Sequence, residues 1–219
     1  MIKEIININN LAKSYKINDN KVVILDDIDF KIFKEDIVSI SGPSGSGKST
    51  LLNILGLLDS NFEGEYSFLN HDTRKLSIDQ KNTIRNKSIG FVHQFFHLIP
   101  DLNVLENIYL PLLINNNNIK NSIKATKEIL INFGLKDRIY ASPNNLSGGE
   151  KQRVAIARAL INKPDIIIAD EMTGNLDQNT ADLIFDFFLE KIKINKQTLI
   201  YVTHNTHYAK KADKLFQIS

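Results

Sequence analysis

The chain has 219 residues, of which 42% are hydrophobic and 24% charged, and its basic residues exceed its acidic ones by two (27 − 25). This length can bury a substantial core, and the scattered lysines lack the clustered basic stripe typical of a nucleic-acid-binding protein. The absence of cysteine excludes disulfides, thiolate metal ligands and a cysteine nucleophile. Residues 1–10 lack the apolar core of a signal peptide, and no apolar run approaches the roughly 20 residues that span a bilayer. We therefore expect no nucleic-acid partner, and contact with a membrane only through other subunits.

Apolar strand-like runs alternate with segments of helical period, which favours an α/β fold. Short strands joined by polar turns in the first seventy residues predict an antiparallel β patch. Three other runs, Ile37–Ser41, Ile166–Asp170 and Thr198–Thr203, are almost continuously apolar, which is typical of parallel strands covered on both faces. The expected strands are, in chain order, Glu4–Asn9, part of Val22–Phe33, Ile37–Ser41, Glu65–Leu69, Ser88–Val92, Ile166–Asp170 and Thr198–Thr203.

Between about residues 90 and 149 the pattern becomes helical. Apolar residues from Ile119 to Phe133 follow a helical period, and Gly134 stands where a helix cap is expected. The four asparagines at 115–118 predict a solvated loop between helices. We expect one domain over residues 1–219, with a core formed by 1–89 and 150–219 and a helical subdomain at about 90–149.

The segment Gly42-Pro43-Ser44-Gly45-Ser46-Gly47-Lys48-Ser49 matches GxxxxGK[ST] at every fixed position, between an apolar strand and an apolar helix-length segment. Glycines let the backbone N–H groups face a phosphate chain, and the following helix adds its positive end. Lys48 is expected to reach the β- and γ-phosphates and Ser49 to hold Mg²⁺. The dinucleotide pattern GxGxxG is excluded, because Gly45-Ser46-Gly47 continues as Lys48-Ser49-Thr50.

Two acids, Asp170 and Glu171, end the strand that begins at Ile166. A parallel strand delivers its carboxyl end to the ligand crevice, so we expect Asp170 to act on the metal through water and Glu171 to polarise the attacking water. An isolated pair of acids would more often cap a helix, but a phosphate loop in the same chain favours the catalytic interpretation. Asn162-Lys163-Pro164-Asp165 has the NKxD pattern of GTPases, yet it precedes a strand and closes a helix, so a GTPase is disfavoured.

A second anion site is predicted at the signature segment, Leu146-Ser147-Gly148-Gly149-Glu150. Ser147 can cap a helix, and the two glycines expose backbone N–H groups at its start. This segment lies about 100 residues after the phosphate loop, which makes sense if one copy supplies the loop and a second copy supplies this site. Together with the phosphate loop and the acidic strand end, it resembles the ATP-binding cassette (ABC) ATPase family over essentially the whole chain.

The resemblance implies a P-loop NTPase (RecA-like) fold: a parallel-sheet core, an N-terminal antiparallel β patch and an inserted helical subdomain. Tyr15, 27 residues before Gly42, resembles the aromatic residue that stacks on adenine. Gln94 resembles the Q-loop glutamine that contacts Mg²⁺ and couples to membrane subunits. Asp177 resembles the D-loop aspartate that acts across the dimer, and His204 resembles the switch histidine that contacts the γ-phosphate.

The implied cofactors are ATP and Mg²⁺, and the implied residues fall into five groups. The catalytic residues are Glu171, His204, Lys48 and Gln94; the ATP-binding residues are Tyr15, Gly42, Pro43, Ser44, Gly45, Ser46, Gly47, Lys48, Ser49 and Thr50; the signature residues that contact ATP of the other copy are Leu146, Ser147, Gly148, Gly149 and Glu150; the D-loop residue is Asp177; and the Mg²⁺ ligands are Ser49, Gln94 and Asp170.

Four segments narrow the resemblance to the lipoprotein-releasing and macrolide-exporter group, and most closely to its lipoprotein-releasing ATP-binding subunits. They are Leu52–Asp59, Gly90–Pro100, Leu105–Leu113 and Thr173–Asp177. The resemblance implies an ATP-hydrolysing subunit that pairs with a second copy and with a related pair of transmembrane permease subunits. Its implied location is peripheral, on the cytoplasmic face of a bacterial inner membrane.

Three alternatives are open. The first is a related macrolide or peptide exporter, or a division-associated complex. A soluble ABC ATPase acting on ribosomes or DNA usually carries two cassettes or a long coiled coil, for which 219 residues leave no room. A binding module without turnover would need a lesion in Lys48, Asp170, Glu171 or His204, and none is present. Met172 and Asn205 replace the family's usual Pro and Asp, but neither change removes a catalytic group.

Overall fold

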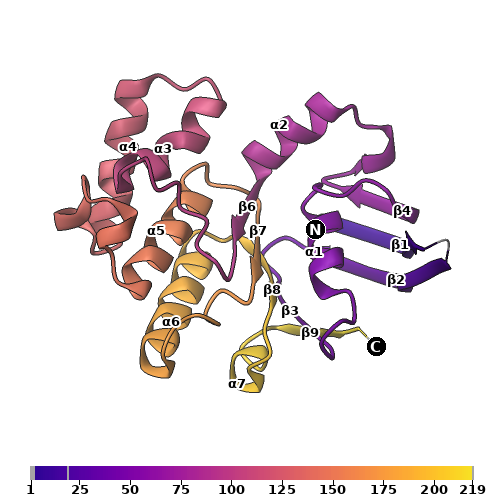
Figure 1. Ribbon diagram of the computed structural model, residues 1–219. Coiled ribbons are helices and arrows are strands. Elements are labelled where there is room, and N and C mark those ends of the chain that lie inside the picture. Colours follow the sequence, from indigo (N-terminus) through magenta and orange to yellow (C-terminus); the bar gives the residue numbers. More distant parts are fainter. Residues whose placement is uncertain (1–2, 19, 219) are drawn as a thin grey trace. The chain divides into compact units, whose positions relative to one another are not determined.

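The computed structural model describes residues 3–18 and 20–218 (Figure 1). Met1, Ile2, Asp19 and Ser219, which the predicted domain includes, lie outside the described residues. The chain divides into two compact units, Met1–Arg85 with Thr198–Ser219, and Asn86–Gln197. None of the described helices is both long and apolar enough to span a membrane.

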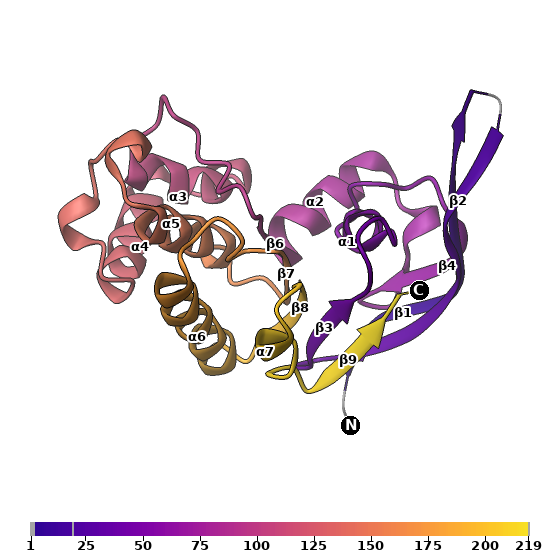
Figure 2. The ribbon, with the colours of Figure 1, turned by 60° about the horizontal axis from the view of Figure 1, so that its bottom comes forward.

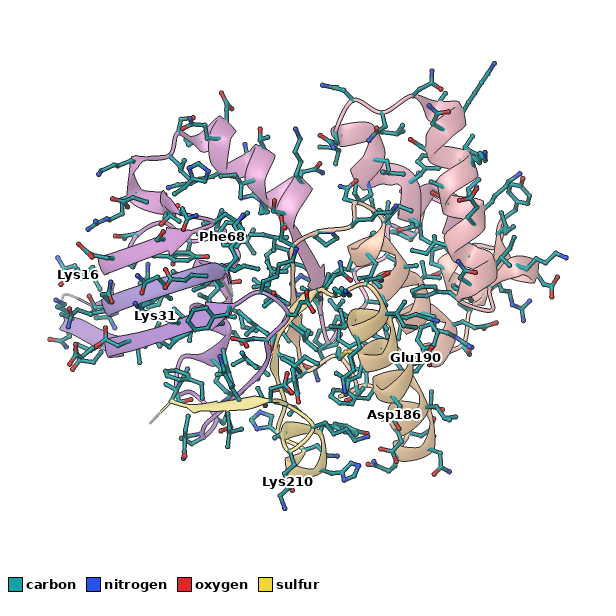
Figure 3. The ribbon with its side chains drawn as sticks, turned by 180° about the vertical axis from the view of Figure 1, so that it is seen from behind. Lys16, Lys31, Phe68, Asp186, Glu190 and Lys210 are labelled. Carbon is teal, nitrogen blue, oxygen red and sulfur yellow. The ribbon has the colours of Figure 1, made fainter. Side chains whose placement is uncertain are left out.

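The first unit contains an antiparallel sheet in the order β2-β1-β4-β5. It confirms the antiparallel patch predicted from the sequence. Apolar side chains of its strands are buried, among them Phe68, which is labelled in Figure 3. The strands are β1 (Glu4–Ile17), β2 (Asn20–Phe33), β4 (Glu63–Phe68) and β5 (His71–Asp72).

Strand β1 extends well beyond Asn9, where the sequence predicted its end. The pairing of β1 with β2 shifts register between Ile8 and Leu11, and Asn10 between them has a φ of +50°. This bulge breaks the alternation of apolar and polar residues, so the sequence pattern stops although the strand continues. The extension carries Lys13 and Tyr15 on the same sheet.

The first unit also holds three parallel strands, with β3 (Ile37–Ser41) between β8 (Thr198–Val202) and β9 (Lys214–Gln217). Figure 2 shows β3 and β9 side by side. Residues Ile37 to Ile40 are buried, as the apolar run predicted. Strand β9 escaped prediction because it is short and three of its four residues are exposed.

The first unit also contains helix α1, most of helix α2 (up to Arg85) and two shorter helical elements. Helix α1 (Lys48–Leu55) follows β3, and the buried Tyr66 hydroxyl donates to the Leu55 carbonyl over 2.7 Å, which fastens α1 to β4. Helix α2 (Ile78–Ser88) buries no side chain, so it has no apolar stripe by which a sequence could reveal it. The shorter elements are η1 (Thr73–Lys75) and α7 (Thr206–Ala209).

The second unit pairs β6 (Ile89–Val92) with β7 (Ile166–Asp170) in parallel. Helix α5 (Gly148–Leu160) packs so closely that a Cβ on Gly90 would lie 2.4 Å from the Ala159 carbonyl oxygen. Its other elements are α3 (Val104–Ile114), α4 (Ile119–Asn132), η2 (Lys136–Arg138), η3 (Pro143–Asn145) and α6 (Gln178–Ile194). Figure 3 labels Asp186 and Glu190, two exposed acids one turn apart on α6.

The predicted boundaries of α4 are confirmed. Gly134 has a φ of +66°, and its N–H bonds to the Ile131 carbonyl while Leu135 bonds to Leu130, which closes the last turn. The asparagine tract lies between α3 and α4, and its last residue, Asn118, caps α4 through the Lys120 N–H. Gly134 therefore ends α4 and the asparagine tract precedes it, as the sequence predicted.

Candidate functional site

The phosphate loop connects β3 to α1, and its glycines are required for different physical reasons. A Cβ on Gly42 would lie 2.4 Å from the Ile218 carbonyl oxygen, so the position has no room for a side chain. Gly45 has open space around it but a φ of +82°, and Gly47 caps α1 with a φ of +87°. Non-glycine residues rarely adopt the angles of Gly45 and Gly47, so these two positions favour glycine for their backbone conformation and Gly42 for lack of space.

Lys48 and Ser46 supply the polar groups of this loop. The Lys48 side chain is largely buried, and its ammonium donates to the carbonyls of Gly42 at 3.0 Å and Pro43 at 2.7 Å. The buried Ser46 hydroxyl has no hydrogen-bond partner among the described residues. A folded-back cation and an orphaned hydroxyl within a curled backbone fit a ligand rich in anionic oxygen atoms. The loop therefore fits the phosphates of ATP.

Tyr15 lies beside a buried ion pair in the same unit. The Lys13 ammonium is 4.8 Å from the Tyr15 ring centroid and 2.7 Å from Asp59 Oδ2, and it also donates to the Asn61 carbonyl. Burial raises the pKa of Asp59, but the Lys13 ammonium, the Asn61 N–H and the Tyr15 side chain more than reverse this and lower it overall. The Tyr15 side chain is 43% exposed, so part of its surface is open to a ligand.

In the second unit, Asp170 ends β7 and Glu171 follows in a left-handed conformation with a φ of +42°. The Gly174 N–H donates to the Glu171 carbonyl at 2.9 Å, which makes a tight turn immediately after the two acids. Strained backbone of this kind is common at functional sites. Both side chains are partly exposed, as a carboxylate that meets a metal or a water must be.

The turn after Glu171 lies against the Q-loop glutamine. A Cβ on Gly174 would lie 2.8 Å from Gln94 Nε2, and the Asn175 side chain donates to the Gln94 carbonyl at 2.9 Å. Asp177 caps α6 by accepting from the Thr180 N–H at 3.1 Å, and hydrogen bonds from the Thr180 side chain and then from its N–H lower the pKa of Asp177. The turn that leads to Asp177 therefore contacts the predicted Q-loop residue, Gln94, through Gly174 and Asn175.

The oxygen donors predicted to hold Mg²⁺ have suitable chemistry. Mg²⁺ prefers a carboxylate, hydroxyl or amide oxygen and keeps most of its ligands as water or phosphate. Asp170, Gln94 and Ser49 supply such atoms. Within the described part of the chain, no group of three or more His, Cys, Asp or Glu side chains is arranged to hold a metal by itself. This donor set suits an ion that arrives with a nucleotide.

The segment Phe95–Pro100 follows Gln94 and is called the docking segment below, after the role proposed for it. Two side chains, one from α5 and one from α3, hold its backbone. Arg158 on α5 donates to the Phe96 carbonyl at 2.8 Å and the His97 carbonyl at 2.7 Å. Asn107 on α3 is fully buried, shares the two hydrogens of its amide among three carbonyls within 3.1 Å and accepts from the Ile99 N–H. Its backbone is thus fixed while the Phe95 side chain remains 63% exposed.

Two histidines, His93 and His97, lie on either side of Gln94 in the sequence. The rings of His93 and His97 are 4.9 Å apart between centroids. Burial lowers the pKa of His93, and His97 and Arg158 add to this effect against the opposing charge of Asp170. A neutral His93 is therefore favoured beside the end of β7.

The signature segment begins α5 with a complete capping box. The Ser147 hydroxyl accepts from the Glu150 N–H at 3.3 Å, while the Glu150 carboxylate accepts from the Ser147 N–H at 2.8 Å and from its hydroxyl at 2.9 Å. Arg138 Nε lies 2.7 Å from the other carboxylate oxygen. The hydrogen bond from Arg138, followed by those from Ser147, lowers the pKa of Glu150 to about 2.

The glycines of the signature segment lie against the start of α6. A Cβ on Gly148 would be 3.0 Å from Leu176 Cδ2, and one on Gly149 would be 2.9 Å from Thr180 Cγ2. Leu146 is buried, whereas Ser147 is exposed. The segment therefore anchors through its leucine and glycines and presents its serine outward.

His204 follows β8 in the first unit and is exposed. The next residue, Asn205, caps α7 by accepting from the His207 N–H at 2.9 Å. Asn and Asp are equally good N-caps, so the departure from the usual Asp preserves this tether. Met172, the other departure, has a buried side chain.

Four residues of these sites have no motif that would reveal them in the sequence. Lys13, Arg138 and Arg158 act through partners 12 to 62 positions away, at separations that follow no period. Asn107 contacts carbonyls between residues 99 and 103, in the loop before its own helix. Two of them lie close to a motif: Lys13 precedes Tyr15 by two residues, and Arg158 lies on the helix that begins at the signature segment. The remaining pairs become visible only in the folded chain.

The curled phosphate loop and the parallel strands define a P-loop NTPase, and comparisons with known proteins place it within a family. A family model described as ABC transporter matches residues 25–174. The Lipoprotein-releasing system ATP-binding protein LolD of Wigglesworthia glossinidia brevipalpis is 46% identical over 210 residues, which cover 95% of this chain and 91% of the relative. The protein of the same name from Rickettsia bellii (strain RML369-C) is 42% identical over 218 residues, covering 100% and 96%.

A solved structure agrees with this placement. The dimeric post-hydrolysis state of the ATP-binding cassette MJ0796, bound to ADP and Pi, superposes with a TM-score of 0.88 at 39% identity, covering 98% of this chain and 94% of that one. The chain belongs to the ABC transporter family, as one of its ATP-binding, ATP-hydrolysing subunits. The fold class predicted from the sequence is thereby confirmed.

Proposed function

We propose that this chain is the ATPase subunit of a lipoprotein-releasing complex of a bacterial inner membrane. The observation that carries the proposal is the 42–46% identity, over nearly the whole chain, to proteins named as ATP-binding subunits of a lipoprotein-releasing system. Four segments of the sequence that resemble the same group support it: Leu52–Asp59, Gly90–Pro100, Leu105–Leu113 and Thr173–Asp177. The proposed location of the chain is peripheral, on the cytoplasmic face of the membrane, and it contacts the membrane only through partner subunits.

In the proposed reaction, the phosphate loop residues Gly42–Thr50 hold the triphosphate of ATP and Tyr15 stacks on its adenine. Glu171 orients a water molecule and accepts its proton as the oxygen attacks the γ-phosphorus. Lys48 and His204 stabilise the charge that develops on the phosphoryl oxygens. Ser49, Gln94 and Asp170 would hold Mg²⁺, which when bound neutralises phosphate charge.

The proposed working unit contains two copies of the chain arranged head to tail. ATP held by one copy meets Ser147 and the backbone N–H groups of Gly148 and Gly149 from the other. The solved relatives that support this arrangement are themselves described as dimers. Within each copy, we propose a single domain whose helical part, about residues 90–149, moves as the dimer closes and opens.

The docking segment is proposed to transmit that motion. Phe95 is largely exposed while Arg158 and Asn107 hold the backbone behind it, so a rigid loop presents an apolar group to a partner helix. The proposed partners are a related pair of permease subunits, whose extracytoplasmic domains would lift lipoproteins from the outer leaflet towards the outer membrane.

The experiment that tests this function captures the complex. Tagged Glu171→Gln protein is purified with ATP from detergent-solubilised membranes, and co-purifying membrane proteins are identified by mass spectrometry, with Phe95→Asp/Glu171→Gln as the matched control. We expect two related subunits with few membrane spans and large periplasmic domains, recovered far less with the control. A single homodimeric partner with an efflux adaptor would instead assign drug or peptide export.

A further inference from the structure

The signature segment of this chain carries a negative charge at a position where it must receive a polyanion. Glu150 accepts three hydrogen bonds from Ser147 and Arg138, which leaves it a fully ionised carboxylate. Its Oε2 atom is 2.9 Å from the Ser147 hydroxyl. Under the proposed function, that hydroxyl meets the γ-phosphate of ATP bound to the other copy. An uncompensated carboxylate so close would repel the nucleotide.

Capping alone does not require this charge. A glutamine at the same position of a capping box also accepts from the N-cap backbone N–H, so the helix start could be built without an anion. The charge at Glu150 therefore needs a separate explanation for how a triphosphate is tolerated nearby. Among the described residues, the cation that pairs with Glu150 is Arg138.

Arg138 is well placed to cancel that charge. It ends η2, a turn that is twelve residues before Glu150, and its Nε lies 2.7 Å from Glu150 Oε1. The two oxygens of the carboxylate are thus divided, with Oε1 facing the guanidinium and Oε2 facing Ser147. Arg138 also fixes the rotamer of Glu150. The single hydrogen of the Ser147 hydroxyl is donated to Glu150 Oε2, and it must leave that oxygen to be donated to a phosphate. Pairing with Arg138 weakens the attraction of the carboxylate for this hydrogen.

We infer that Arg138 is a positioning residue of the signature site, which neutralises Glu150 so that the Ser147 hydroxyl can turn from this carboxylate to the γ-phosphate of ATP held by the second copy. The inference rests on the proposed function. It identifies a pair, Arg138 and Glu150, that acts as a unit. Replacing Arg138 alone should therefore weaken ATP-dependent dimerisation more than replacing Arg138 and Glu150 together.

The test measures the ATP concentration that gives half-maximal dimerisation, followed by light scattering. Every variant carries Glu171→Gln so that bound ATP persists. At about 50 mM salt we expect Arg138→Met to raise this concentration at least about tenfold, and Arg138→Lys to recover most of the loss. In a Glu150→Gln background, adding Arg138→Met should change it less than about twofold.

Two controls separate charge from folding. Lys136→Met removes an exposed cation from the same turn, η2, and should shift the midpoint less than about twofold. Binding of a fluorescent ATP analogue by the monomer should be the same in all variants. The Arg138→Met effect should also shrink at about 0.5 M salt, because the pair is partly exposed to solvent.

Two results would overturn the inference alone: an Arg138→Met protein that dimerises like the reference, or a loss equally large in the Glu150→Gln background. The second result would show that Arg138 acts through the fold and not through the charge of Glu150. A Glu171→Gln reference that stays monomeric with saturating ATP would overturn the proposed two-copy site, and this inference with it.

Discussion

The ammonium group of Lys13 lies 4.8 Å from the centroid of the Tyr15 ring. The same ammonium pairs with Asp59 at 2.7 Å, and Asp59 follows the end of α1, the helix that begins at the phosphate loop. Tyr15 is thereby connected to the element that positions the phosphates. A buried cation on one face of the ring leaves the exposed part of Tyr15 for adenine.

This relationship predicts that Lys13→Met weakens recognition of the base and not of the phosphates. The chain has no tryptophan, so Tyr15→Trp provides a single fluorescent reporter of stacking. In that background we expect Lys13→Met to raise the dissociation constant for ATP about three- to tenfold and to leave that for tripolyphosphate unchanged. Lys21→Met, at an exposed position of β2, is the matched control. Equal losses for both ligands would contradict the prediction.

Glu171→Gln should bind ATP normally but hydrolyse it at least about tenfold more slowly, because a positioned general base contributes roughly 10²–10⁴-fold to such reactions. The comparison requires steady-state phosphate release and an independent titration with ATP. Asp165→Asn, which alters an exposed acid at the other end of β7, serves as the control. Turnover near that of the wild type would remove Glu171 from its proposed role.

Asn107 should be a major stabilising residue of the second unit. Its side chain is fully buried; its two amide hydrogens are shared among the carbonyls of residues 99, 102 and 103, and its oxygen accepts from the Ile99 N–H. Replacement by leucine leaves those groups without partners, so we expect a loss of about 2 kcal/mol or more in the free energy of unfolding. Asn117→Ala, which removes one exposed bond, should cost less than about 1 kcal/mol. Denaturant titration with equal outcomes for both variants would contradict this account.

The ion pair of Arg138 and Glu150 predicts a specific pH dependence of stability. The pKa of Glu150 falls from an ordinary value near 4.5 to about 2, mainly through the hydrogen bond from Arg138. A lowered pKa stabilises the folded state above the ordinary value, and this stabilisation disappears as the pH falls towards 2. The stability difference between wild type and Glu150→Gln should therefore be constant above about pH 5 and shrink below about pH 4.5. In an Arg138→Met background, most of this pH dependence should be lost.

The sequence predicted those parts of the fold where local pattern and tertiary role coincide. The run from Ile37 to Ser41 is apolar because it lies between two parallel strands, and Gly134 ends α4 because only a left-handed residue closes that turn. The family, the fold class and the ATPase activity were all predicted from three short motifs and are confirmed by the comparisons.

The parts that escaped prediction lack a local signal for identifiable reasons. Helix α2 buries nothing, so its composition is that of a polar loop. Strand β1 continues past a bulge at Asn10 that interrupts its alternation. The pairs formed by Lys13 with Asp59 and by Arg138 with Glu150 join residues through the tertiary fold, at separations of 46 and 12 positions that match no helical or strand period at those places.

The central claim is that each ATP is held by the phosphate loop of one copy and the signature segment of another. Two variants each disable one part of this composite site. Lys48→Ala disables the phosphate loop. Ser147→Arg places a bulky cation in the signature segment and should leave ATP binding by the monomer nearly intact. Hydrolysis by either variant alone should be abolished.

The most direct measurement mixes the two variants, both carrying Glu171→Gln, and determines the mass of the particles with ATP by light scattering together with the bound nucleotide. One composite site of such a mixed pair contains both lesions and the other contains none. The account predicts that each variant alone stays monomeric, whereas the mixture forms heterodimers with a single ATP per pair. A mixture that remains monomeric at saturating ATP would contradict it.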